Sequence, residues 1–139
     1  INVMTNAHHR VPNTSNNINV RGVLKDTSSS IYRGLIKIEK NAQQTNSYLS
    51  EHSLMIGKNA LANSIPSLEI DANDVKASHG STTGKIDEEQ IFYLMSRGLS
   101  RRESERLIIE GFFIPIIEKI PLQEVRERIA AAVTRKMDA

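Results

Sequence analysis

Histidine side chains are the first candidates for chemistry in this sequence of 139 residues, which contains four histidines and no cysteine. Without cysteine, the chain alone cannot supply a thiolate nucleophile, a disulfide or a cysteine-ligated zinc or iron–sulfur centre. His79 stands in a small, polar, glycine-punctuated stretch from Ala77 to Gly84. A neutral imidazole there could bind a metal ion while its second nitrogen is held by a hydrogen-bond acceptor. The alternative is a histidine that only forms hydrogen bonds within a junction loop.

The other histidines are weaker candidates for metal ligands. His8 and His9 are neighbours, and on a strand they would point to opposite faces, which is poor geometry for chelating one ion. A surface or subunit contact is the simpler role for both, and His52 beside Glu51 is a similarly weak candidate. A small metal-dependent enzyme using His8, His9 or His79 is kept as an alternative function, and it predicts tight metal uptake by the isolated chain.

Two common catalytic motifs do not occur in the sequence. The stretch from Gly80 to Lys85 is too short for a phosphate-binding G-x-x-x-x-G-K-[ST] loop, and no hydroxyl residue follows Lys85. Ser78 and His79 are sequence neighbours, but no G-x-S-x-G elbow accompanies them. Hydrolase chemistry therefore has no support.

The composition bounds the class of protein. The sequence is 39% hydrophobic and 24% charged, which is ordinary for a soluble protein, and an aromatic content of 4% requires an aliphatic core. No run of about 18 apolar residues occurs, so no membrane-spanning helix is expected. The polar first residues do not resemble a secretion signal, and we expect a cytoplasmic location. A net charge of +2, without a basic stripe interleaved with aromatics, does not indicate a nucleic-acid partner.

Residues 1–76 are expected to be rich in β-strand. Apolar residues there come in short clusters with members two positions apart, such as Leu68 and Ile70, which is typical of a strand with one buried face. Strand clusters separated by turn-forming residues indicate a sandwich, a barrel or a β-solenoid. The scarcity of aromatics favours the solenoid. The polar segment from Gln43 to His52 is expected to be a turn or a solvent-facing strand.

Residues 85–139 are expected to be helical, because helix-capping signals recur there. Asp87 can cap a first helix, which Gly98 would end, and Ile91, Leu94 and Met95 are expected to form its buried stripe. Ser100, followed three residues later by Glu103, has the spacing of a capping box for a second helix.

The second and third helices are predicted from proline positions and apolar spacing. The second helix should run from about Arg101 to Phe113, with a break or kink near Pro115. Pro121 suits the first turn of the last helix. The apolar stripe of that helix consists of Leu122, Val125, Ile129, Val133 and Met137.

A dense apolar cluster surrounds Pro115. One narrow helix face cannot cover all of these side chains, so some of them could form an exposed patch that docks into a partner groove. The alternative is that they fill the space between the helices and the β-rich part. The cluster consists of Phe112, Phe113, Ile114, Ile116 and Ile117.

Three motifs together resemble a known family. The pattern P-x-LEI-x-A-x-DVK occupies residues 66–76, SHG occupies residues 78–80, and G-x-IDEEQIFYL-x-SRG occupies residues 84–98. They resemble the SufB/SufD family of iron–sulfur cluster assembly proteins, and the SHG followed by DEEQIFYL is closer to its SufD-like members. The likeness implies the C-terminal portion of a typical member.

The resemblance implies a fold that is β first and then α. Its expected form is a right-handed β-helix (a solenoid) followed by a small helical domain. The C-terminal coils of the β-helix core would occupy residues 1–84, and the helical domain would occupy residues 85–139.

The resemblance also implies a scaffold subunit that is not an enzyme. It would pair through its β-helix with a SufB-like paralogue or with itself, and its helical domain would bind the ATPase SufC. His79 matches the family histidine at the paired interface, so we expect it to be the metal-binding residue. Relatives often have Cys where this chain has Ala77, so a partner would supply the sulfur ligands of a transient cluster. No stably bound cofactor is expected, and neither nucleic acid nor membrane is an expected partner.

The region from Arg97 to Ile117 is the expected SufC contact on the strength of this resemblance. Arginines would form its charged rim, although solvated helix faces commonly look the same. The predicted contact residues are Arg97, Arg101, Phe112, Phe113 and Ile116.

Overall fold

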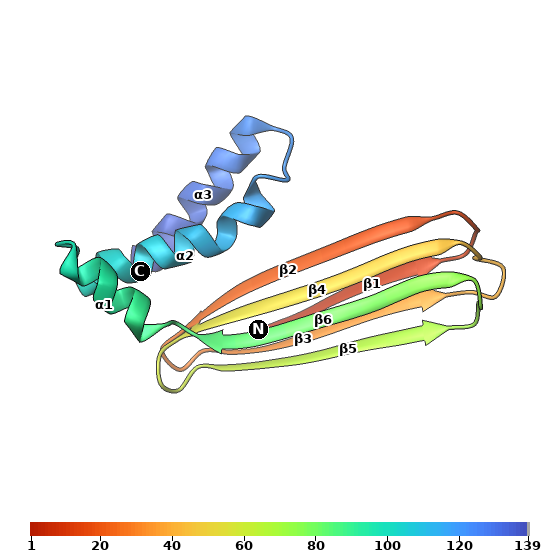
Figure 1. Ribbon diagram of the computed structural model, residues 1–139, viewed down its shortest axis with the longest axis horizontal. Coiled ribbons are helices and arrows are strands. Elements are labelled where there is room, and N and C mark those ends of the chain that lie inside the picture. Colours follow the sequence, from red (N-terminus) through yellow and green to blue (C-terminus); the bar gives the residue numbers. More distant parts are fainter. Residues whose placement is uncertain (139) are drawn as a thin grey trace. The chain divides into compact units, whose positions relative to one another are not determined.

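The computed structural model describes residues 1–138, which form six strands followed by three helices (Figure 1). The chain divides into two compact units, Ile1–Lys85 and Ile86–Ala139, called here the strand unit and the helical unit. The strands are β1 (Asn2–His9), β2 (Ser15–Lys25), β3 (Ser29–Ile38), β4 (Thr45–Ile56), β5 (Leu61–Ile70) and β6 (Val75–Lys85). The helices are α1 (Glu88–Ser96), α2 (Arg101–Ile117) and α3 (Gln123–Asp138).

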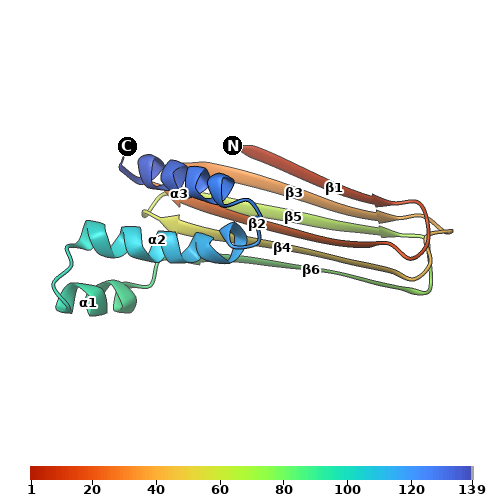
Figure 2. The ribbon, with the colours of Figure 1, turned by 90° about the horizontal axis from the view of Figure 1, so that it is seen from above.

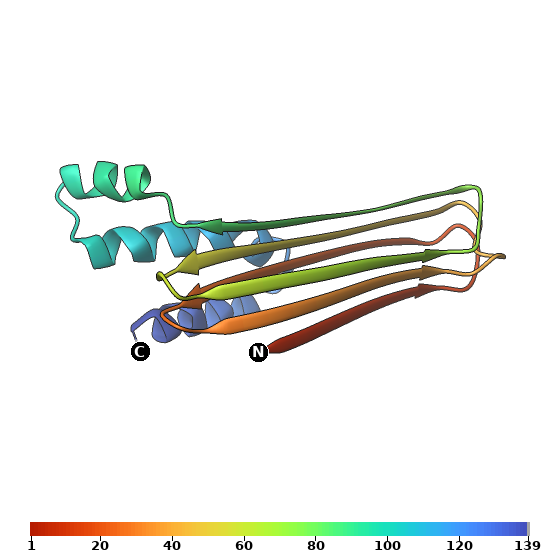
Figure 3. The ribbon, with the colours of Figure 1, turned by 90° about the horizontal axis from the view of Figure 1, so that it is seen from below.

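The strand unit consists of two parallel three-stranded sheets. Their strand orders are β1-β3-β5 and β2-β4-β6, so consecutive strands belong to different sheets. Consecutive strands also run in opposite directions (Figures 2 and 3). Residues at matching positions of neighbouring strands in one sheet lie side by side, although they are far apart in the sequence: Ile18 pairs with Leu49, and Leu49 pairs with His79.

The predicted right-handed β-helix is wrong. Residues 1–138 form two separate parallel sheets followed by helices, and not a solenoid. The strands are long, from 8 residues in β1 to 12 in β4, where short strands were expected. Alternating apolar residues show only that each strand has one buried face. The assignment of strands to sheets depends on pairing register, which that alternation does not encode.

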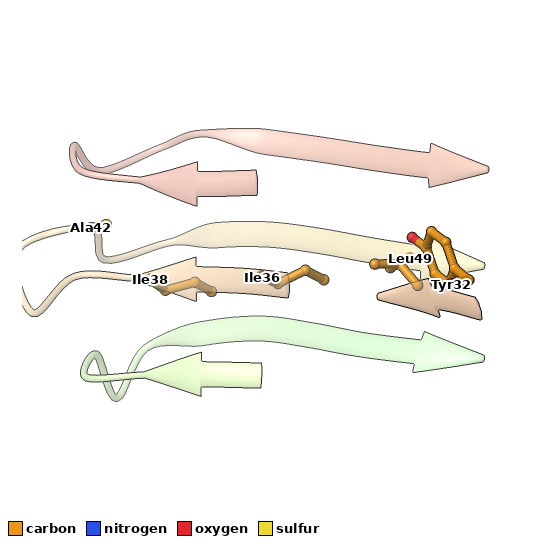
Figure 4. Close-up of a cluster of buried hydrophobic side chains, with 5 residues drawn as sticks. All are labelled: Tyr32, Ile36, Ile38, Ala42 and Leu49. Atoms are coloured by element: carbon orange, nitrogen blue, oxygen red, sulfur yellow. The ribbon is translucent and has the colours of Figure 1, made fainter. Parts of the chain in front are cut away.

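The core of the strand unit is small and mostly aliphatic. Its buried cluster consists of Tyr32, Ile36, Ile38, Ala42 and Leu49 (Figure 4). Full burial of one such aliphatic side chain stabilises the fold by roughly 1.5–3 kcal/mol. Gly34 makes the packing possible, because a Cβ there would lie 2.5 Å from Leu49 Cδ1 and 2.7 Å from the Tyr32 hydroxyl.

The polar segment expected as a turn or a solvent-facing strand is largely β4, the central strand of its sheet. Thr45, Ser47, Ser50 and Glu51 are buried there. Their polar atoms have partners within the unit: Ser50 Oγ, for example, donates to Asn19 Oδ1 at 2.8 Å. Buried hydroxyls are tolerated when they are hydrogen-bonded, so the polarity of this segment did not indicate exposure.

Helix caps in the helical unit confirm the predicted starts of α1 and α2. The Asp87 side chain accepts a hydrogen bond from the Glu89 backbone N–H at 2.9 Å. Gly98 follows the end of α1 with φ of +96°, a conformation that favours glycine. Ser100 and Glu103 form the complete capping box.

The predicted end of the second helix is wrong. α2 continues through Pro115 to Ile117. Pro115 stands in the last turn, where its missing N–H removes one intrahelical hydrogen bond near the helix end. The Glu118 backbone N–H still donates to the Ile114 carbonyl at 2.9 Å. Across residues 1–138, no helix is long and apolar enough to cross a membrane.

Candidate functional site

His79 lies within an edge strand of the strand unit. It is part of β6, so the predicted junction loop is wrong for this residue. Its neighbour across the sheet is Leu49, a buried core residue, and Ala77 two positions earlier also packs against the core. Since alternate residues of a strand share a face, His79 is on the inner face of β6. The imidazole is nevertheless exposed, because β6 is the last strand of its sheet.

The imidazole of His79 has no hydrogen-bond or ion-pair partner among residues 1–138. Its two ring nitrogens are therefore accessible to a ligand. The adjacent Gly80 lets Tyr48 lie close to β6, since a Cβ at position 80 would be 3.3 Å from the Tyr48 hydroxyl. The SHG motif thus places an accessible imidazole beside a tightly packed backbone.

The edge that carries His79 is partly apolar. β5 and β6 are the last strands of the two sheets and contact each other. On β5, Leu68 and Ile70 leave 37% and 39% of their surface exposed, and their partners Ile36 and Ile38 are fully buried. We call this β5–β6 border, with Leu68, Ile70 and His79, the open edge.

His8 and His9 point to opposite faces of β1, as their adjacency predicted. His9 is buried, and its ring nitrogens lie 2.7 Å from Thr14 Oγ1 and 3.2 Å from Ser47 Oγ. Burial, and secondarily the nearby His8, lower the pKa of His9. His8 Nε2 lies 2.8 Å from a Glu39 carboxylate oxygen. Both histidines are therefore engaged with protein partners.

No group of three or more His, Cys, Asp or Glu side chains suited to a metal ion occurs within residues 1–138. His52 Nδ1 is 2.6 Å from Thr82 Oγ1, on the side of β4 opposite to Leu49. The alternative of a metal-dependent enzyme based on His8, His9 or His79 therefore has no ready cluster of ligands.

Arg101 joins two helices of the helical unit. Its guanidinium donates to both oxygens of Glu88, at 2.7 and 2.9 Å, and to Glu105 at 3.0 Å. The hydrogen bonds and charge of Arg101 lower the pKa of the Glu88 carboxyl. This arginine thus has a structural role in connecting α1 to α2, whether or not it also touches a partner.

The other predicted contact residues of the helical unit lie on α2 and at the end of α1. Phe112 and Phe113 are half-buried and pack edge to face, with ring centroids 5.4 Å apart. Ile116 is also half-buried. Arg97 lies over the ring of Tyr93, 5.1 Å from its centroid, at the end of α1.

Exposed aromatic side chains on α1 were missed by the sequence reasoning. Phe92 and Tyr93 leave 74% and 56% of their surface exposed, and Met95, expected in the buried stripe, leaves 43%. Only Ile91 of this helix is fully buried. Their exposure could have been predicted from the sequence. Phe92 and Tyr93 directly follow Ile91, so on a helix with one narrow buried stripe they must point away from it. We call Phe92, Tyr93, Met95 and Arg97 the α1 patch.

Comparison with known proteins identifies the family. The family model described as "SUF system FeS cluster assembly, SufBD core domain" matches residues 1–112. The chain belongs to the SufB/SufD family. The match includes the strand unit, α1 and most of α2, so both His79 and the α1 patch fall within it.

Individual SufB/SufD relatives resemble most of this chain. It is 39% identical to the iron–sulfur cluster assembly protein SufD of Bacillus subtilis over 116 residues, or 84% of the chain. It is 34% identical to SufD of Escherichia coli over 83% of the chain. An iron–sulfur cluster assembly SufBD family protein of Mycobacterium tuberculosis is 37% identical over 94% of the chain. These alignments span 26%, 27% and 35% of the respective relatives.

Proposed function

We propose that this chain is part of a SufD-like scaffold in iron–sulfur cluster assembly and that it catalyses no reaction itself. Membership of the SufB/SufD family and the names of its SufD relatives support this role. The observation that carries the site assignment is the exposed imidazole of His79, which has no partner within residues 1–138.

In this proposal, His79 supplies one nitrogen ligand to a nascent cluster at the open edge. A neutral imidazole is a common iron ligand, and Rieske centres show that histidine can replace cysteine on a cluster iron. Since the chain has no cysteine, thiolates for the remaining positions must come from a partner. Iron and sulfide are substrates of the assembly, held only until the cluster is passed on.

The partner at the open edge is proposed to be a SufB-like paralogue or a second copy of this chain. The two terminal strands present unpaired backbone groups, which readily pair with another strand. Leu68 and Ile70 add apolar surface that such a partner would bury. A molecular-mass measurement by light scattering should give twice the chain mass for self-pairing, and Leu68→Lys should return the mass to that of one chain. A single-chain mass at all concentrations, with no complex on adding the paralogue, would remove this interface.

The helical unit is proposed to bind a SufC-like ATPase. The exposed α1 patch supports this, because aromatic side chains and arginine are enriched at the centres of protein interfaces. The half-buried Phe112, Phe113 and Ile116 would extend the contact along α2. ATP hydrolysis would then belong to the partner, and its movements would reach the scaffold through these helices.

The cluster site can be tested by reconstitution on the complete complex. Wild type, His79→Ala and His52→Ala are mixed with the SufB-like and SufC-like partners, iron and sulfide, and cluster absorbance is followed. We expect His79→Ala to lower the yield several-fold and His52→Ala to leave it unchanged, since His52 is engaged with Thr82. An undiminished yield with His79→Ala would leave this histidine a structural role only.

The ATPase contact can be tested with matched charge insertions. Phe92→Asp places a charge on the α1 patch, whereas Leu122→Asp places one on a comparably exposed apolar residue before α3. We expect only Phe92→Asp to abolish co-elution with the ATPase, while both variants keep the wild-type circular dichroism. Phe113→Asp extends the test to α2. Equal binding by all variants would remove the docking assignment.

A further inference from the structure

Glu51 lies on the inner face of the strand unit, next to the cross-strand pair that contains His79. It is part of the central strand β4, and only 3% of its surface is exposed. Across the sheet Glu51 pairs with Ser81 of β6, two residues beyond the pair of Leu49 with His79. Since alternate residues of a strand share a face, Glu51 and Ser81 form the next pair on the face that carries His79, roughly 7 Å further along the strands.

The Glu51 carboxylate joins the edge strand β6 to the central strand β4. One of its oxygens accepts a hydrogen bond from Ser53 Oγ, which holds the carboxylate on its own strand. The other oxygen accepts from Ser81 Oγ of β6 at 2.9 Å, and this second bond is partly buried. Hydrogen bonds to a charged acceptor are stronger than those between neutral groups, and a low local dielectric strengthens them further. The bond from Ser81 therefore stabilises the pairing of β6 with β4 in addition to the backbone ladder.

His79 depends on the backbone of β6 for its position. β6 is the last strand of its sheet, so it pairs with β4 on one side only, and such weakly supported segments open locally most easily. A histidine that binds a metal is usually oriented by a hydrogen bond at its second ring nitrogen, but the His79 imidazole has no such partner among the residues that the structure describes. A ligand must be held within roughly 0.5 Å of its productive position. Any contact that keeps β6 paired with β4 beside His79 therefore also positions the imidazole.

We propose that Glu51 is a positioning residue for His79. Its hydrogen bond with Ser81 keeps β6 paired with β4, so that the imidazole stays at one place on the open edge. The pair on the outer face contributes less, because His52 Nδ1 and Thr82 Oγ1, 2.6 Å apart, are exposed to solvent and water can replace either partner. The inference rests on the function proposed for His79, and Glu51 itself touches neither iron nor sulfide.

The first test measures the opening of β6 in the complete chain without any partner. Amide hydrogen exchange, followed by nuclear magnetic resonance, compares wild type with Ser81→Ala, Ser81→Thr and Ser53→Ala. We expect the β6 amides that are bonded to β4 to exchange about tenfold faster in Ser81→Ala, because a hydrogen bond to a charged group is lost. Ser81→Thr keeps the hydroxyl and should restore the wild-type rate.

Ser53→Ala is the matched control for this experiment. It makes the same chemical change and removes the other hydrogen bond of the same carboxylate, but it leaves the bond between Glu51 and Ser81 in place. We expect its β6 amides to exchange at the wild-type rate. The amides of β3, in the other sheet, should exchange at the wild-type rate in every variant, which verifies that the strand unit remains folded.

The second test asks whether this contact matters to the cluster. Clusters are assembled on the complete complex, with this chain alone carrying ¹⁵N-histidine, and pulsed electron paramagnetic resonance detects nitrogen bound to iron. We expect Ser81→Ala to show a several-fold smaller fraction of clusters with ¹⁵N coupling, and Ser81→Thr and Ser53→Ala to match wild type. A loss of folded protein would lower the number of clusters, but it would not change the coupled fraction among those that form.

Two results would overturn the proposal. One is a wild-type rate of β6 exchange in Ser81→Ala, and the other is an unchanged coupled fraction in that variant. Failure of the function proposed for His79 gives a different result, an undiminished cluster yield with His79→Ala. The positioning of a ligand would then fall with that function, while the exchange rates would still show whether Glu51 stabilises the pairing of β6.

Discussion

Replacing Gly34 by alanine should destabilise the strand unit, because this glycine fills the tightest position in the core. A Cβ at position 34 would lie 2.5 Å from Leu49 Cδ1 and 2.7 Å from the Tyr32 hydroxyl, well inside normal contact distance. Both neighbours are almost fully buried, at 1% and 3% exposure, so neither can move away without disturbing the core. The backbone itself does not require glycine, since φ is not positive at this position.

The expected change in the free energy of unfolding is the sum of two opposing contributions. Alanine in place of glycine at a compatible backbone stabilises a protein by about 0.4–1 kcal/mol through the unfolded chain. Overpacking a filled core costs about 1–3 kcal/mol. Gly84 supplies the matched control, because a Cβ there meets nothing within 4 Å. We therefore expect Gly34→Ala to be about 1–3 kcal/mol less stable than Gly84→Ala.

Urea denaturation followed by far-ultraviolet circular dichroism measures this difference. Gly80→Ala adds an intermediate point, since its Cβ would contact only the movable Tyr48 hydroxyl, at 3.3 Å. The expected order of stability is Gly84→Ala, then Gly80→Ala, then Gly34→Ala. If Gly34→Ala were as stable as Gly84→Ala, the close packing of the two sheets around Leu49 would be refuted.

Three further perturbations test other parts of the structure. Lowering the pH through 6.5, the ordinary pKa of histidine, should destabilise the strand unit. Burial lowers the pKa of His9 in the folded state, so as the pH falls the unfolded chain binds a proton at this histidine before the folded chain does. Urea titrations at pH 7.5 and 5.5 should show a smaller loss for His9→Gln, and an equal loss would contradict this origin. Ser100→Ala should cost about 1 kcal/mol by removing the cap of α2, and unchanged thermal unfolding of the helical signal would argue against the cap. Leu49→Ala should cost about 2–5 kcal/mol in urea denaturation, and a loss below 1 kcal/mol would argue against its core position.

Helix boundaries could be predicted from the sequence where the signal is local. Asp87, Gly98 and the Ser100–Glu103 pair act within one turn, so their residue types are sufficient. Pro115 misled the prediction, because a proline near a helix end removes little hydrogen bonding. The order of strands before helices was also predicted, whereas the β-helix was not found, because pairing between distant strands has no local signature.

The candidate site was predicted in part. The SHG motif and its resemblance pointed to His79, but only the structure assigns it to an edge strand, with its imidazole exposed. Glu51 was overlooked, because a polar residue in a polar segment gives no sign of burial. The exposure of Phe92 and Tyr93 was not predicted, because the sequence analysis considered only the apolar stripe of this helix. That stripe was expected to be buried as a whole, yet its member Met95 is also exposed.

The most direct test of the proposed function asks whether the imidazole of His79 touches the nascent cluster. Pulsed electron paramagnetic resonance on the reduced cluster in the complete complex detects nitrogen bound to iron, and ¹⁵N-histidine labelling of this chain alone identifies its source. We predict a ¹⁵N coupling in wild type that disappears in His79→Ala. A cluster that forms without any ¹⁵N coupling, or one whose coupling survives in His79→Ala, would contradict the assignment.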